Sequence, residues 1–414
     1  MLSDKQGFNK AQKTFAPARN RRSSLINTAI AFDIQVLDLM SISYQRHRIS
    51  GIDIIRIVCA LLIYMGHSIG SYGCTYGSQL ADAIIFSARS PIMSMFFMLS
   101  GFSISYNYLN GNEWDYHATR QFYAKRLIQI VPAYLLIHIL WLFLGKDSFI
   151  RWLFLTPLEL TALQSMYPNI MGLLHNGGTW FISCLLISYL IYPILRCIFH
   201  DSKPGTVFSC TICITAALIY LPFIDHYYSL GGAVYTNPVL RALEFTLGVL
   251  ANYCAFYISR SRDHVRHSFR IGTSGFVISV LLCVVLIYLR IDPVVLGSRK
   301  LAFTLDSLLL YPILMIILYI SYISRSSFLE NNRVLKYMSG LIYYFFILQL
   351  VLWRITDFAF AVIRGITGTD LKTNSIKIVL SFSICLILSI AISELINKPF
   401  SKWCFRKLSV FRQN

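Results

Sequence analysis

An apolar stretch near the start of the chain carries three side chains that could do chemistry. Residues 52–67 read IDIIRIVCALLIYMGH and include Asp53, Arg56 and His67. On an α-helix the eleven positions from Arg56 to His67 make about three turns, so both lie on one face, roughly 16 Å apart along the axis. Histidine, with an unperturbed pKa of about 6.5, suits acid–base chemistry. Arginine binds phosphates through paired hydrogen bonds.

The same stretch is apolar enough to lie in a membrane, where ionisable groups are costly and are functional candidates. Two structural interpretations remain open for the pair. Arg56 could snorkel to the lipid headgroups, and His67 could make a hydrogen bond between helices. Asp53 lies three residues before Arg56 and could pair with it across one helical turn.

Composition places the whole chain in the membrane class. The protein has 414 residues, of which 56% are hydrophobic and 14% charged, whereas soluble domains carry about 25% charged residues. The net charge of +18 could indicate nucleic acid, but the basic residues form no stripe or RNA-binding motif, so we expect no nucleic-acid partner. They lie between apolar segments, as in a multi-pass membrane protein. Cys210 and Cys213 have no second pair or histidine cluster beside them, so we expect no metal site.

The apolar segments predict an all-α integral membrane protein with about ten transmembrane helices, because a bilayer needs about 20 helical residues per span. A further helix, expected around residues 152–163, is too short to cross the bilayer and is expected to lie at the membrane–water interface. The ten spans are expected near residues 52–72, 91–109, 124–144, 179–199, 206–224, 238–258, 271–290, 301–323, 335–354 and 376–397.

The distribution of basic residues predicts that both termini are cytoplasmic, in a cell (inner or plasma) membrane. With that orientation, the inside loops and tail include Arg120, Lys203, Arg260, Arg262, Arg266, Arg270, Arg325, Arg333, Lys402, Arg406, Lys407 and Arg412. The outside loops include Arg89, Lys146, Arg151, Arg299, Lys300 and Lys372. We therefore divide the chain into a basic cytoplasmic extension (1–48), a transmembrane domain (49–400) and a basic cytoplasmic tail (401–414).

Six blocks, in order along residues 50 to 405, resemble the membrane-bound acyltransferase-3 family, the O-acyltransferases that decorate bacterial surface polysaccharides. In the first block Asp53, Arg56 and His67 occupy the family's places. Ser100 and Gly101, in the second, predict close helix packing. The other blocks are FFMLSGFSI (96–104), FYAKRLIQIVPAYL (122–135), TWFISCLLISYLIYPIL (179–195), NPVLRALEFTLGVL (237–250) and SELINKPFSKW (393–403).

The resemblance implies transfer of an acyl group, expected to be acetyl, from cytoplasmic acyl-CoA to a hydroxyl of a surface polysaccharide or its lipid-linked precursor. Acyl-CoA would be a donor substrate, with no bound cofactor. The expected catalytic residues are His67, Arg56 and Asp53, the donor-binding residues Arg56, Lys125 and Arg126, and the acceptor-binding residues Trp180, Phe181, Arg241 and Glu244. His67 would activate the acceptor hydroxyl or relay the acyl group.

Other interpretations of these residues stay open. Arg241 and Glu244, one turn apart, could form an ion pair that only pins their helix. Trp180 and Phe181 could be membrane-interface anchors. A transporter or flippase for a polysaccharide intermediate is the alternative function, although the chain lacks the repeated halves that many transporters show.

The sequence departs from the family's pattern in three places, and two of these departures, Gln129 and Gln349, support a third alternative, an inactive relative. Gln129 stands where the third-span block commonly has a second arginine, three residues after Arg126. Gln349 stands where the ninth span usually has a histidine. The Trp-Phe segment also lacks the paired glutamates that many relatives carry.

Overall fold

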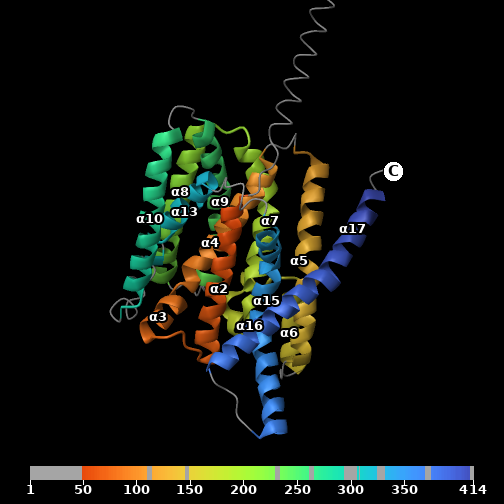
Figure 1. The fold of residues 1–414 in the computed structure, drawn as a ribbon. Helices are drawn as coiled ribbons and strands as arrows, with labels where there is room; N and C mark the ends of the chain where they lie inside the picture. Colours follow the sequence, from red (N-terminus) through yellow and green to blue (C-terminus); the bar gives the residue numbers. More distant parts are fainter. Residues whose placement is uncertain are drawn as a thin grey trace, which may run out of the picture. The chain divides into compact units, whose positions relative to one another are not determined.

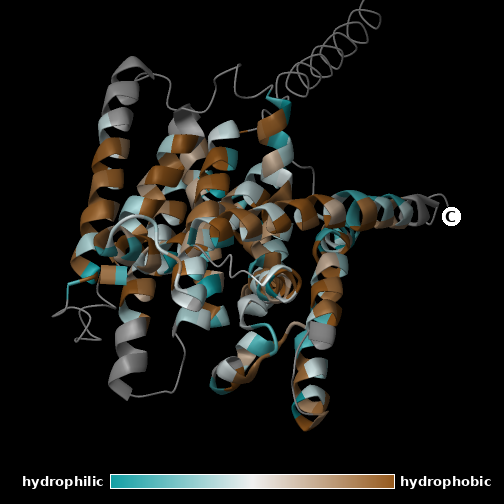
Figure 2. Cartoon of the chain, turned by 60° about the horizontal axis from the view of Figure 1, so that its bottom comes forward, coloured by the Kyte–Doolittle hydropathy of each residue, from teal (hydrophilic) through white to brown (hydrophobic). Residues whose placement is uncertain are grey.

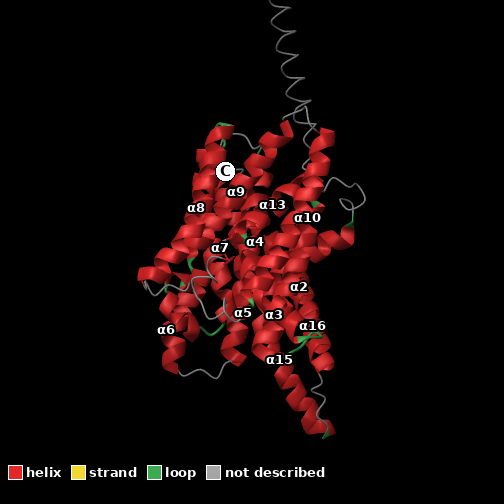
Figure 3. Ribbon diagram, turned by 90° about the vertical axis from the view of Figure 1, so that its left-hand side faces the viewer, coloured by secondary structure: helices red, strands yellow, loops and turns green. Residues whose placement is uncertain are grey.

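The computed structural model describes residues 49–109, 114–144, 149–228, 234–260, 265–292, 305–306, 308–323, 332–368 and 374–410. The chain divides into two units between Arg48 and Ile49, and all the described residues belong to the second unit. The predicted extension 1–48 and the last four residues of the predicted tail therefore lie outside the described residues. Every regular element in the described part is helical, and none of it is strand (Figure 3).

The helices follow one another closely along the chain. The first group is α2 (Ser50–Tyr72), α3 (Gln79–Ser87), α4 (Arg89–Tyr108), α5 (Tyr116–Leu144), α6 (Phe149–Leu160), the short 3₁₀ helices η1 (Gln164–Met166), η2 (Pro168–Leu173) and η3 (Gly177–Thr179), and α7 (Trp180–Phe199). The second is α8 (Pro204–Tyr228), η4 (Val234–Thr236), α9 (Pro238–Arg260), α10 (Val265–Arg290), α13 (Leu310–Ile323), α15 (Arg333–Thr367), α16 (Asn374–Ala391), the π-helical turn η6 (Ile392–Asn397) and α17 (Lys398–Val410).

Among the described residues, 8 helical segments are long and apolar enough to cross a membrane. They are Ser50–Gly70, Gln79–Tyr108, Tyr116–Trp141, Gly177–Phe199, Pro204–Leu221, Pro238–Tyr257, Arg333–Trp353 and Asn374–Phe405. Two shorter apolar helices, Ser274–Arg290 and Leu310–Ile320, fall on the two remaining predicted segments. The all-α membrane class is thus confirmed, while the number of ten spans and the cytoplasmic termini stay predictions.

A pair of glycines brings α4 and α9 into backbone contact. A methyl group on Gly101 would overlap the carbonyl oxygen of Phe245, and one on Gly248 would overlap that of Met98. Asn252 Nδ2 donates to Ser105 Oγ over 2.9 Å between the same two helices. Small residues allow this approach in membrane helices, so the close packing expected at Gly101 is confirmed.

The other helices pack around this pair (Figure 1). Helices α7, α8 and α13 each contact α9, and α10 packs against α13. On the other side α2 contacts α4 and α15, and α15 contacts α5 and α16. Aromatic rings fill the seam between α2 and α15: Trp353 stacks on Tyr72 with ring centroids 4.1 Å apart and on Tyr64 at 5.9 Å.

Two helices run beyond the spans expected from hydropathy. The helix expected at 335–354 continues to Thr367. Hydropathy ended the predicted span too early, because Arg354, Asp357 and Arg364 are charged but do not break a helix. Gly368, with φ 68°, ends the helix. The segment expected at 376–397 continues through the π-helical turn into α17. Figure 2 shows the hydrophobic stretches of these helices and the mixed colouring of α17 near the C-terminus. The predicted interfacial helix at 152–163 corresponds to α6.

Candidate active site

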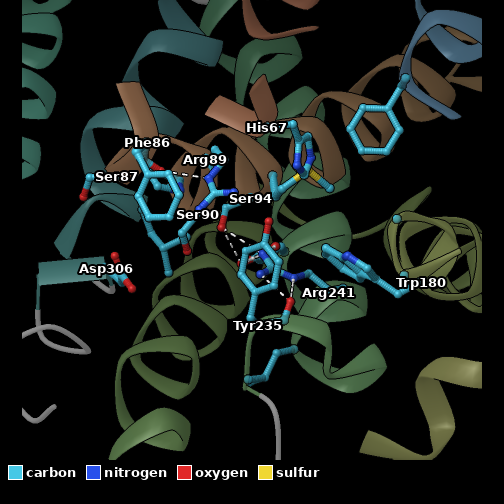
Figure 4. A pocket seen from close by; sticks show the side chains of 18 of the residues that line it. His67, Phe86, Ser87, Arg89, Ser90, Ser94, Trp180, Tyr235, Arg241 and Asp306 are labelled. Atoms are coloured by element: carbon cyan, nitrogen blue, oxygen red, sulfur yellow. Dashed lines mark hydrogen bonds and ion pairs between the residues drawn. The ribbon is translucent and has the colours of Figure 1, made fainter. Parts of the chain in front are cut away.

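A cavity of about 490 Å³ lies near the C-terminal end of α2. Its walls come from α2, from the α3–α4 junction, from the first turns of α7 and α9, from the end of α10, and from α15. Figure 4 shows His67, Arg89, Ser94, Tyr235, Arg241 and Trp180 grouped together, although they come from α2, α4, η4, α9 and α7. The polar or charged side chains in its lining are His67, Ser87, Arg89, Ser90, Ser94, Trp180, Tyr235, Arg241, Glu244, Arg290 and Asp306.

His67 projects into this cavity from the last third of α2. The side chain is half-buried, and its ring nitrogens make no hydrogen bond with any described residue. Both His67 and Arg56 face α4, since Arg56 donates to Ser103 Oγ over 2.8 Å and His67 shares the cavity with the first residues of α4. Because His67 has no hydrogen-bond partner among the described residues, its ring nitrogens are available to a substrate in the cavity.

Arg89 lies against α2 beside His67 (Figure 4). Its side chain crosses Gly66 and Gly70, because a methyl group on Gly66 would meet Arg89 Cδ at 2.6 Å. The guanidinium carbon lies 3.6 Å from the centre of the Phe86 ring, and Nε donates to the Phe86 carbonyl oxygen over 3.0 Å. Sequence reasoning counted Arg89 only as a loop cation. The signal that could have found it is the pair of glycines that flank His67 with helical spacing.

Arg241 and Glu244 form a buried ion pair at the start of α9. Arg241 Nη1 lies 2.9 and 2.8 Å from the two carboxylate oxygens, and Ser94 Oγ of α4 donates to Glu244 Oε1 over 2.7 Å. Arg241 also donates to the Tyr235 carbonyl oxygen through Nε and Nη2, over 2.9 and 2.7 Å. The expected ion pair is therefore present and joins α9 to α4 and η4, and both residues line the cavity. Their binding of an acceptor stays a prediction.

A second arginine–carboxylate pair closes the side of the cavity formed by α10. Arg290 Nε lies 2.7 Å from Asp306 Oδ1, and Nη2 donates to Asp306 Oδ2 over 3.2 Å. Arg290 Nη1 donates to Ser87 Oγ over 2.8 Å. The pair thus ties the end of α10 to the end of α3.

The two aromatic residues expected at the acceptor site have different environments. Trp180 lines the cavity, and the Arg241 guanidinium carbon lies 5.6 Å from its ring. Phe181 is not in the lining; its ring packs on Phe97 and Phe346, with centroids 5.0 and 4.9 Å away. Phe181 is therefore a core residue behind the cavity wall, because successive residues of a helix point about 100° apart.

The cations expected to bind the donor do not reach this cavity. Arg56 contacts α4 nearer the N-terminal end of α2, and Asp53 accepts a hydrogen bond from Ser339 of α15. The Arg126 guanidinium carbon lies 5.5 Å from the ring centre of Phe122 and 5.6 Å from that of Tyr189. Lys125 is exposed. Arg56, Lys125 and Arg126 are thus all outside the lining of the cavity that contains His67.

A buried polar network that sequence reasoning missed supports one wall of the cavity. His175 Nδ1 lies 2.5 Å from Glu159 Oε2, and the His175 backbone N–H donates to Oε1 over 2.8 Å. His138 Nε2 lies 3.0 Å from Tyr134 Oη, which donates to the Glu159 carbonyl oxygen. Burial raises the pKa of the Glu159 carboxyl, and the hydrogen bonds with His175 oppose that rise. The network anchors the loop that carries the cavity-lining Gly177 and Gly178.

Among the described residues no group of three or more histidine, cysteine or acidic side chains is placed to hold a metal ion. Cys210 is half-buried on α8, and Cys213 is exposed on the same helix.

The fold and the cavity define a class: an all-α membrane protein with a cavity lined by polar and ionisable side chains. Residues 49–396 match the model of the acyltransferase domain of the acyltransferase-3 type. The chain belongs to this family, which makes it a membrane acyltransferase. Searches of curated proteins and of solved structures found no match.

Proposed function

We propose that the protein transfers an acyl group, expected to be acetyl, from cytoplasmic acyl-CoA to a hydroxyl of a surface polysaccharide or its lipid-linked precursor. The observation that carries the proposal is His67, which lines a cavity of about 490 Å³ beside Trp180 and the Arg241–Glu244 pair. A cavity of this size holds a sugar unit, and an aromatic side chain with a few convergent polar groups is typical of a small-molecule site.

The separation between the two ends of α2 suits the donor. Acyl-CoA carries its phosphates at one end and its thioester at the other end of an extended pantetheine arm. In this proposal Arg56 and Arg126 bind the phosphates, while His67 lies roughly 16 Å further along the helix axis than Arg56. Exposed Lys125 would add a third cation near the phosphates.

The chemistry needs one proton acceptor. His67 takes the proton from the acceptor hydroxyl as its oxygen attacks the thioester carbonyl carbon. The new C–O bond forms, the C–S bond breaks, and the proton passes to the CoA thiolate as it leaves. The overall reaction is the same if the acyl group is first bound covalently to the His67 imidazole and then transferred to the acceptor hydroxyl.

The test compares cells that make the intact protein, His67→Ala and His117→Ala at equal membrane levels. His117 is an exposed histidine at the start of α5 and serves as the matched control. O-acetyl signals in the NMR spectrum of extracted polysaccharide report transfer, and the amount of surface polysaccharide reports export.

The proposal predicts that His67→Ala removes the O-acetyl signals at normal export, while His117→Ala keeps them. Unchanged acylation with reduced export would refute the acyltransferase role of this site and favour the transporter. Unchanged acylation and unchanged export would remove His67 from the mechanism.

A further inference from the structure

The charges around the cavity do not balance. Three arginines line it, Arg89, Arg241 and Arg290. Arg241 is paired with Glu244, and Arg290 with Asp306. Among the described residues, Arg89 has no carboxylate within ion-pair distance. One guanidinium charge at the cavity is therefore left without a protein counter-charge in the part of the chain that the structure describes.

Two connections that adjoin cavity-lining helices in the sequence also lack acidic residues. Residues 229–233, between α8 and η4, contain no acidic residue. Residues 293–304 follow the end of α10 and contain Arg299 and Lys300 but no acidic residue. Neither connection can supply the missing carboxylate.

Contacts fix the Arg89 side chain in one position but leave its terminal guanidinium nitrogens free to bind a ligand. Gly66 and Gly70 leave room for its aliphatic part on α2, and the Phe86 ring lies 3.6 Å from its guanidinium carbon. Only Nε donates a hydrogen bond, to the Phe86 carbonyl oxygen. The two terminal nitrogens donate to no described residue. An arginine fixed in this way presents a two-nitrogen edge that fits a carboxylate or a phosphate.

We propose that Arg89 anchors an anion subsite beside His67, so that the acceptor carries a carboxylate or phosphate close to the hydroxyl that is acylated. This inference rests on the proposed function. Trp180 borders the same cavity and offers a ring face for the sugar. Arg89, the first residue of α4, lies against α2 at Gly66, the residue before His67. A neutral sugar would leave the guanidinium without an ionic partner, so the site discriminates by charge.

The experiment uses the full chain in nanodiscs of zwitterionic phosphatidylcholine, so that the lipid carries no net charge. Three probes share one pyranose ring: methyl glucoside, methyl glucuronide and glucose 1-phosphate. Calorimetry gives the dissociation constant of each for the wild type, Arg89→Gln, Arg89→Lys and Arg364→Gln. Arg364 is an exposed arginine near the C-terminal end of α15, outside the cavity lining, and is the matched control.

We expect an anionic probe to bind the wild type about tenfold more tightly than methyl glucoside, as a hydrogen bond to a charged group would give. Arg89→Gln should remove that preference, Arg89→Lys should keep part of it, and Arg364→Gln should keep all of it. The preference is a ratio within one protein sample, so a smaller folded fraction does not change it. Stronger binding of glucuronide indicates a carboxylate-bearing sugar, and stronger binding of glucose 1-phosphate indicates a phosphorylated acceptor.

Equal binding of the neutral and anionic probes to the wild type would overturn the proposal, as would a preference that survives in Arg89→Gln. The two proposals fail separately. Absence of acyl transfer by the wild type with an intact charge preference refutes the proposed function and leaves the anion subsite. Acyl transfer without a charge preference refutes the subsite alone.

Discussion

Arg241 and Glu244 lie one turn apart on α9, and Arg241 Nη1 contacts both carboxylate oxygens, at 2.9 and 2.8 Å. Both side chains are buried, at 4% and 8% exposure. Breaking such a pair leaves an uncompensated charge in a low-dielectric site, which costs more than losing the attraction alone.

We therefore expect Glu244→Gln to lower the free energy of unfolding by about 3 kcal/mol, measured by chemical unfolding in detergent. The matched control is Glu394→Gln, which breaks the exposed pair with Lys398 and should change stability little. Equal effects of the two substitutions would mean that burial does not set the strength of the Arg241–Glu244 pair.

The contact between α4 and α9 gives a second prediction. Gly248→Ala places a methyl group on the Met98 carbonyl, so the helices must separate and Ser94 must move away from Glu244. We expect a loss of about 2 kcal/mol, as for other overpacked sites, seen as a lower melting temperature. Gly275→Ala on α10, where a methyl group meets no atom within 4 Å, should be neutral or slightly stabilising. A tolerated Gly248→Ala would show that the two backbones are not in contact.

The Glu159–His175 contact predicts the behaviour of the loop that it anchors. Glu159→Gln keeps the shape of the side chain but removes the charge that holds the His175 ring and backbone N–H. Hydrogen exchange of backbone amides in residues 161–179 should become faster by about tenfold, if the loss is about 1.4 kcal/mol. Exchange within α7 beyond its first turn should stay the same. Unchanged loop exchange would show that other contacts hold this wall of the cavity.

Gln349 supplies a prediction of opposite sign. This side chain of α15 is 1% exposed, and among the described residues neither polar atom of its amide has a hydrogen-bond partner. Burying an unsatisfied amide costs about 1–3 kcal/mol, so Gln349→Leu should raise the free energy of unfolding. A loss of stability would instead show that the amide is hydrogen-bonded in the membrane, for example to a buried water.

The helices were predictable because hydropathy averages over many residues, and the shared face of Arg56 and His67 follows from helical periodicity. Arg89 was not predictable, because it lies next to a turn in sequence and only the fold bends it over Gly66 and Gly70. Glu159 and His175 are 16 positions apart, and the backbone between them is irregular. Helical periodicity therefore could not predict that their side chains meet. Trp180 and Phe181 have different environments because α7 turns one face to the cavity and another to the core. The sequence alone did not show which face each residue occupies.

A labelled donor tests whether His67 is the group that enables acyl transfer. Membranes that contain the intact protein, His67→Ala or His117→Ala in equal amounts are incubated with acetyl-CoA labelled in the acetyl group, and label is counted in the glycan fraction. We expect His67→Ala to lower the initial rate by about a hundredfold or more, while His117→Ala leaves it unchanged. A His67→Ala protein that transfers label at the rate of the intact protein would contradict this expectation.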